Sequence, residues 1–124
     1  MLIHDKAHEL VRALRQSPEY KDLLAAADRL RQDPATLKMF LDFRRTELEY
    51  DTKIMTGAEA DPAEIESINK RREIVFLNSL IREYVEKEMR FGTIFSDVQR
   101  IINGAVQEVA SIYAEMGNEE GGQE

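Results

Sequence analysis

The sequence predicts an all-α fold of four to five helices, arranged as a long antiparallel helical hairpin or bundle and paired as an intertwined dimer. The first observation is composition: 33% of the residues are charged, and only 6 are Gly and 3 are Pro. Such a composition favours helices and leaves few residues for the turns of a sheet. The second is that every proline follows Ser or Asp. The third is an apolar seven-residue repeat over residues 77–116.

The three prolines predict three helix starts. Proline is tolerated at the first helical position, where its missing N–H would be unpaired anyway, and a preceding Ser or Asp side chain can accept hydrogen bonds from the next free amides. We expect one loop at residues 56–61, where Gly57 can end the preceding helix. The helices are therefore expected at residues 3–16, 18–32, 34–55 and from 62 onward.

The helix at residues 34–55 has two apolar edges, one with Phe40 and one with Phe43. A single apolar stripe serves one neighbour, so two edges predict that this helix packs against more than one other helix.

The repeat at residues 77–116 predicts a helix that lays one apolar seam along partner helices. In one unbroken helix this stretch would span about 60 Å, more than a compact domain of this size needs. We therefore expect the seam to lie between two copies of the chain. The expected interface residues are Leu77, Ile81, Tyr84, Phe91, Phe95, Val98, Ile102, Val109 and Ile112.

Gly92 leaves two arrangements open. Glycine inside a helix costs about 1 kcal/mol relative to alanine, which packing can offset, so the helix can continue and embrace a second chain. Gly92-Thr93 can equally end one helix and start another, which would give a compact bundle with a smaller dimer interface. Residues 117–124 are acidic and Gly-rich, so we expect a single domain over residues 1–116 followed by a disordered tail.

Charge and composition exclude several classes of partner and site. The net charge of −7 disfavours nucleic acid and anionic membrane surfaces, which are bound chiefly through Lys and Arg. The chain has no Cys, which excludes disulfides and cysteine-ligated metals. No signal peptide and no apolar stretch long enough for a membrane span is visible, so a soluble cytoplasmic protein is expected.

Two features could carry chemistry. His4 and His8 lie four residues apart and could share a metal, with Asp5 beside them. The sequence offers neither a third histidine nor a second acid–x–x–His pair, so we expect no metal, cofactor or catalytic residue. A metal-binding helical-bundle enzyme that uses His4 and His8 is the alternative. The basic run at residues 70–72 is surrounded by Glu residues and predicts ion pairs rather than a phosphate site.

Several short motifs occur in an order and spacing that resemble one family. They are Leu14-x-x-Ser17-Pro18-Glu19-Tyr20, Leu30-x-x-Asp33-Pro34 leading into Phe40 and Phe43, the Gly57 loop, Tyr84-Val85-x-x-Glu88, and Phe95-x-x-Val98-x-x-Ile101-Ile102. Together they resemble the YlbF/YmcA family of small bacterial helical proteins, which includes YheA-type members. The resemblance spans nearly the whole chain.

The resemblance implies long hairpin-like helices that assemble into dimers or larger oligomers. It also implies a regulatory role in competence, sporulation, biofilm formation or mRNA processing, exerted through complexes with other proteins. Some members carry cysteines that hold iron–sulfur clusters, a property that a chain without Cys does not share. We therefore expect a non-catalytic cytoplasmic oligomer whose partners are further copies of itself and other proteins.

Overall fold

A computed structural model describes the backbone of residues 2–122 and the side chains of residues 2–117. Every regular element within this described range is a helix, which confirms the all-α class. By their internal contacts the residues fall into two units, Met1–Arg90 and Phe91–Glu124, called unit 1 and unit 2. Contacts rather than independent stability define these units, so the single domain over residues 1–116 stays a prediction.

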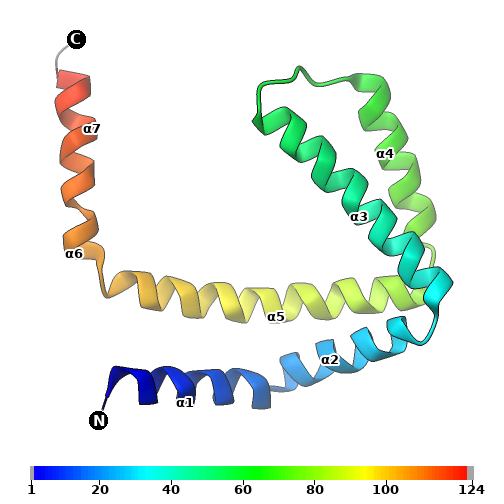
Figure 1. Ribbon diagram of the computed structural model, residues 1–124, viewed down its shortest axis with the longest axis horizontal. Coiled ribbons are helices and arrows are strands. Elements are labelled where there is room, and N and C mark those ends of the chain that lie inside the picture. Colours follow the sequence, from blue (N-terminus) through cyan, green and yellow to red (C-terminus); the bar gives the residue numbers. More distant parts are fainter. Residues whose placement is uncertain (1, 123–124) are drawn as a thin grey trace. The chain divides into compact units, whose positions relative to one another are not determined.

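Unit 1 contains four helices and the beginning of a fifth (Figure 1). These are α1 (Ile3–Gln16), α2 (Pro18–Arg31), α3 (Pro34–Met55), α4 (Pro62–Val75) and the first part of α5 (Ser79–Gly104). The bounds of α1 and α3 agree with the sequence prediction, and α2 ends one residue early. Helices α3 and α4 form a hairpin around the loop at residues 56–61. Helix α3 packs against both α2 and α4, as its two apolar edges predicted.

The predicted helix starts are confirmed by side-chain hydrogen bonds. The capping contacts are Ser17 Oγ with Tyr20 N at 3.2 Å, Asp33 Oδ1 with Thr36 N at 3.2 Å, and Asp61 Oδ1 with Ala63 N at 3.0 Å. Each side-chain oxygen accepts from a backbone N–H that has no partner within its own helix. The proline and its preceding residue therefore act together at all three sites.

Gly57 ends α3, as predicted. Its φ of +102° lies in the left-handed region, which side chains with a Cβ rarely adopt. The N–H of Gly57 donates to the carbonyl of Ile54 and the N–H of Ala58 to that of Lys53, both at 3.1 Å. This pair of bonds satisfies carbonyls that the helix leaves free and directs the chain toward α4.

A turn at residues 76–78 separates α4 from α5, so the expectation of one helix from Pro62 through Ile81 is wrong. Asn78 causes the new start, because its Oδ1 accepts from the backbone N–H of Leu80 at 2.9 Å and of Ile81 at 3.2 Å. Its Nδ2 donates to Oγ1 of the buried Thr36 at 3.5 Å. One amide therefore caps α5 and ties its start to α3.

Replacing Asn78 with Ala is expected to lower the free energy of unfolding by about 1–2 kcal/mol, since a lost helix cap costs about that much. Urea denaturation followed by circular dichroism measures the change. The matched control is Ser79→Ala, because Ser79 is exposed on the first position of the same helix. An equal loss in both variants would show that the Asn78 side chain is not the cap.

The hydrophobic core of unit 1 is built from α2 to α5. Its buried members are Leu30, Phe40, Phe43, Ile68, Val75 and Ile81. Two aromatic pairs meet edge to face within it, Phe43 with Phe76 at 6.3 Å and Phe40 with Tyr84 at 5.6 Å between ring centroids. No residue of α1 is buried, so the core lies beyond that helix.

Unit 2 consists of the rest of α5, the short α6 (Gln107–Ala110) and α7 (Ile112–Gly122). Helix α5 continues through Gly92, so the helix does not break at that residue, while the intertwined dimer stays a prediction. Both arrangements assumed an uninterrupted helix from Thr93 to Met116, which is wrong, since the helix is interrupted after Gly104 and again at Ser111. The backbone of α7 is helical past Met116 to Gly122, within the stretch expected to be disordered, and residues 123–124 of that predicted tail lie outside the described residues.

Candidate interaction surface

The first part of the predicted seam belongs to the core of unit 1. Ile81 is fully buried, and its side chain therefore has no surface to offer a partner. Tyr84 is half-buried against the ring of Phe40. Burial raises the pKa of Tyr84 above its ordinary value, and the neighbouring carboxylate of Glu88 adds to the increase. Leu77 lies in the turn before α5 and is 75% exposed.

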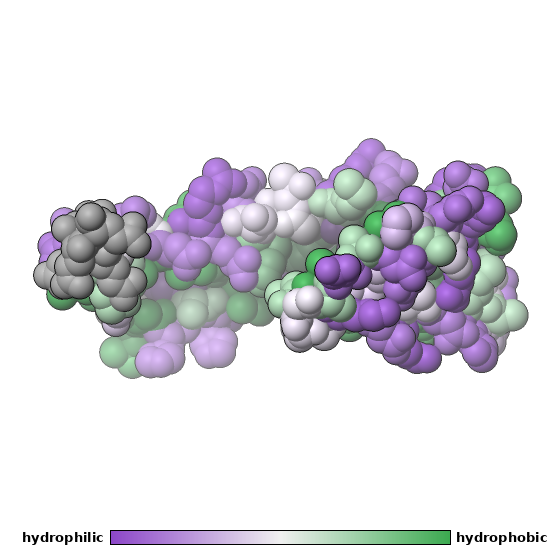
Figure 2. Space-filling view, turned by 90° about the horizontal axis from the view of Figure 1, so that it is seen from above, coloured by the Kyte–Doolittle hydropathy of each residue, from purple (hydrophilic) through white to green (hydrophobic). Residues whose placement is uncertain are grey.

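The second part of the seam lies in unit 2 and is largely uncovered. No side chain described in residues 91–117 is buried. The predicted interface residues here are Phe91 and Val98, which are half-buried, and Phe95, Ile102, Val109 and Ile112, which are exposed. Figure 2 shows hydrophobic residues reaching the molecular surface between hydrophilic ones. That these residues contact a partner stays a prediction.

Phe91, Phe95, Val98 and Ile102 lie along one side of α5, whereas Val109 belongs to α6 and Ile112 to α7. The rings of Phe91 and Phe95, one helical turn apart, stack with centroids 6.2 Å apart. Asp97 and Arg100 form an ion pair with each other, and both are exposed. Contiguous exposed apolar surface on a protein marks a site of interaction or of aggregation. None of the helices in the described part of the chain is long and apolar enough to cross a bilayer.

The basic run at residues 70–72 is engaged within unit 1, as the sequence predicted. Its side chains lie 3.2 Å from Glu66, 3.0 Å from Thr46 and 2.8 Å from Glu47, in chain order. The first contact lies within α4, and the other two join α4 to α3. Glu66 and Glu47 neutralise Lys70 and Arg72, whereas Arg71 donates to a neutral hydroxyl. The basic run therefore contributes to the packing of the α3–α4 hairpin through Arg71 and Arg72.

Ion pairs also connect α5 to the earlier helices of unit 1. Arg44 of α3 lies 3.3 Å from Glu88, and its guanidinium is 5.0 Å from the centroid of the Phe40 ring. Arg29 of α2 pairs with Glu83. Pairs as exposed as these contribute about 0–1 kcal/mol each, so they orient α5 more than they stabilise it.

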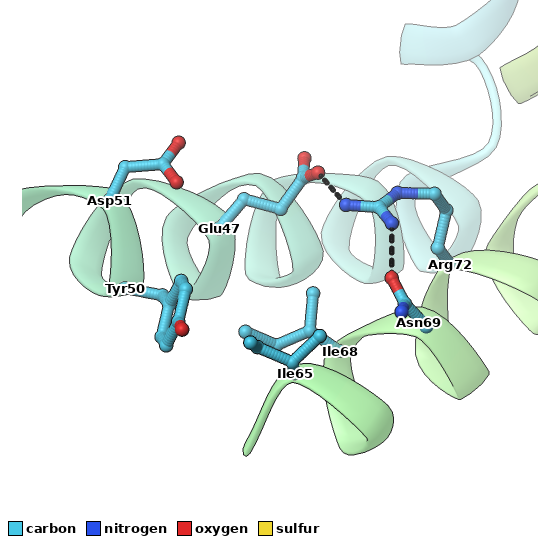
Figure 3. Close-up of a pocket in the computed structure, with 7 residues that line it drawn as sticks. All are labelled: Glu47, Tyr50, Asp51, Ile65, Ile68, Asn69 and Arg72. Carbon is cyan, nitrogen blue, oxygen red and sulfur yellow. Dashed lines mark hydrogen bonds and ion pairs between the residues drawn. The ribbon is translucent and has the colours of Figure 1, made fainter. Parts of the chain in front are cut away.

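A pocket between α3 and α4 was not foreseen from the sequence (Figure 3). It is lined by Glu47, Tyr50, Asp51, Ile65, Ile68, Asn69 and Arg72. Its volume is about 170 Å³, below the roughly 300–1,000 Å³ of sites that hold drug-sized ligands. Arg72, the one cation in the lining, already binds Glu47 at 2.8 Å and Asn69 at 2.6 Å. The pocket is therefore a weaker candidate than the apolar surface of unit 2.

The three residues considered for metal binding, His4, Asp5 and His8, lie exposed on α1. Across the side chains that the structure describes, no group of three or more His, Cys, Asp or Glu residues is placed to hold a metal ion. A zinc site needs at least three protein ligands. The described residues therefore give the metal-enzyme alternative no support.

Comparison with known proteins places this arrangement in a family. A UPF0342 protein of Symbiobacterium thermophilum is 35% identical over 84% of this chain and 93% of its own length. A UPF0342 protein of Bacillus licheniformis is 34% identical over 86% of this chain and 92% of its own. A solved structure of a Bacillus stearothermophilus protein of unknown function (DUF964) has a TM-score of 0.72 and 26% identity, covering 90% of this chain and 95% of that one.

The family match covers both units. Residues 3–107 match the model of a family described as control of competence regulator ComK, YlbF/YmcA. The match takes in α1 to α5 and reaches the start of α6. It agrees with the resemblance drawn from the Ser17-Pro18 and Asp33-Pro34 helix starts. The chain therefore belongs to the YlbF/YmcA family.

Proposed function

We propose that the protein is a non-catalytic regulatory factor that acts as a homo-oligomer and binds other proteins. The observation that carries this proposal is the uncovered apolar surface of unit 2, where Ile102 is 54% exposed and Val109 is 72% exposed. Burying a side chain of this size is worth about 1.5–3 kcal/mol. A chain that leaves many of them in water has much to gain from a partner.

The helices of unit 2 also need a partner for their own stability. Helices shorter than about 12–15 residues are marginal in water unless an apolar face is packed. Helix α6 has 4 residues and α7 has 11, and the side chains described in both are exposed. Association with a second chain would supply the packing that these helices lack.

Family membership supports a regulatory role over a catalytic one. The family is described by its control of a competence regulator. In this proposal unit 1 is a helical unit with its own hydrophobic core, and unit 2 supplies the surface for self-association. Competence, sporulation, biofilm formation and mRNA processing are the processes in which its protein partners are to be sought.

Size-exclusion chromatography with light scattering tests the oligomer directly. The chain mass is 14.3 kDa, and we expect at least twice that mass at micromolar concentration. Dilution should dissociate the assembly if apolar burial drives it, and the helical circular dichroism should fall with it. A strict monomer across the micromolar range would contradict the proposal.

A further inference from the structure

Residues 91–105 have the same pattern of polarity when read in either direction from Val98. Three and four residues before Val98 are Phe95 and Ile94, and three and four after it are Ile101 and Ile102. Seven residues away on either side are Phe91 and Ala105, and six away on either side are Gly92 and Gly104. All other positions in this stretch are polar.

The helix turns this pattern into a symmetric apolar stripe. Successive residues are rotated by about 100°, so positions three, four and seven away from Val98 lie within about 60° of it. Helix α5 is unbroken from Phe91 to Gly104, and Ala105 follows directly. All of the stripe except Ala105 is therefore carried by α5, with Val98 at its centre.

A two-fold axis that passes by Val98 and is perpendicular to α5 would generate a second copy of the helix. The stripe of this second copy would run antiparallel to the first and would have the same pattern along the contact. Phe91 would then face Ala105 of a second copy, which sets the largest side chain of the stripe against the smallest. Ile94 would face Ile102, and Val98 would face its own counterpart. A self-complementary patch of this kind is what a two-fold symmetric dimer requires, whereas a different protein as partner would impose no such symmetry.

The charges also favour an antiparallel arrangement over a parallel one. Residues 105–124 contain five Glu and neither Lys nor Arg. Two parallel helices would start both acidic segments at the same end of the crossing, and like charges at close range repel. The antiparallel arrangement carries the two acidic segments to opposite ends of the crossing.

We infer that two copies of this chain pair in an antiparallel manner along residues 91–105, the last part of α5 and Ala105, with the two-fold axis at Val98. The inference rests on the homo-oligomer proposed above and adds the direction and register of the contact. The uncovered state of the stripe fits it, since Phe95 is 44% exposed and Ile101 is 75% exposed. A Cβ placed on Gly92 or Gly104 meets no other atom within 4 Å, so both glycines flank the stripe in open space.

Single cysteines test the register, because the chain has none of its own. A disulfide forms when the two Cα atoms are about 4.4–6.8 Å apart. Val98→Cys should therefore cross-link two copies on mild oxidation. Ala105→Cys should not, because in the antiparallel pair the two copies of residue 105 are about 21 Å apart along the helix axis. Non-reducing electrophoresis gives the result, and light scattering of each reduced variant gives its mass.

The possible outcomes test the register of the contact separately from the existence of the oligomer. Cross-linking through position 98 and not through position 105 supports the inference. Efficient cross-linking of Ala105→Cys indicates a parallel pair and overturns it. An oligomeric mass without cross-linking at position 98 also overturns the register, although the proposed homo-oligomer stands. A monomeric wild-type chain overturns both.

Discussion

Ile102→Asp is expected to convert the oligomer into a monomer, raising the dissociation constant at least about 100-fold. Ile102 is 54% exposed in the single chain, so an aspartate there would cost little if the chain acted alone. At a subunit interface the carboxylate would be buried without a partner, which costs several kcal/mol, and each 1.4 kcal/mol is a factor of about ten in affinity. Sedimentation or light scattering over a concentration series measures the change.

Ser96→Asp is the matched control for this experiment. It introduces the same charge into the same helix, at an exposed position on the side opposite Val98. Its dissociation constant should stay within about threefold of the wild-type value, since surface substitutions usually change stability by less than about 0.5 kcal/mol. Equal masses for wild type and Ile102→Asp at every concentration would show that the subunit interface does not lie on α5.

Phe43→Ala should have the largest effect on the stability of unit 1, lowering the free energy of unfolding by about 3–5 kcal/mol. Phe43 is 0% exposed, and its ring meets Phe76 edge to face at 6.3 Å. The guanidinium of Arg72 lies 5.7 Å from the centroid of the same ring. Removing the ring leaves a cavity where α3, α4 and the following turn meet. Since the free energy of unfolding of natural domains is about 5–15 kcal/mol, this one substitution would remove a large part of it.

Leu48→Ala, also on α3, provides the comparison for Phe43→Ala. Leu48 is 66% exposed, so its truncation removes little buried surface and should cost less than about 1 kcal/mol. Urea denaturation of both variants, monitored by helical circular dichroism, measures the two losses. Similar losses would mean that the core of unit 1 is not centred on Phe43.

The helix starts of unit 1 could be predicted because they depend on local chemistry. Ser17, Asp33 and Asp61 cap their helices through side chains only two or three residues from the amides that they bind. The left-handed Gly57 is equally local. Such features are present in the sequence itself and need no knowledge of tertiary packing.

The turn at residues 76–78 was missed because it does not disturb the apolar repeat. Leu77 and Ile81 keep the four-residue spacing of a helix although Leu77 lies before α5 begins. Asn78, a good capping residue, was the available signal, and Asn103-Gly104 was the corresponding signal at the end of α5. Periodicity alone cannot distinguish a continuous helix from two that preserve its phase.

Which seam residues are covered could not be read from the repeat either. Ile81 and Ile102 occupy equivalent places in the seven-residue pattern, yet one is 0% exposed and the other 54%. The difference arises because α2, α3 and α4 surround the first, an arrangement that depends on residues far away in the chain. The seam was therefore predictable as a pattern, whereas its division between core and surface was not.

The sequential packing of α1 to α4 affects the order in which the chain folds and associates. The main packing in this part of the chain joins α1 to α2, α2 to α3 and α3 to α4, each pair adjacent along the chain. Chains dominated by such local contacts fold within microseconds to milliseconds. Subunit association depends on concentration and takes milliseconds to minutes. Helices α1 to α4 of each newly made chain should thus be folded for an interval before a second copy is bound, during which the net charge of −7 limits indiscriminate aggregation.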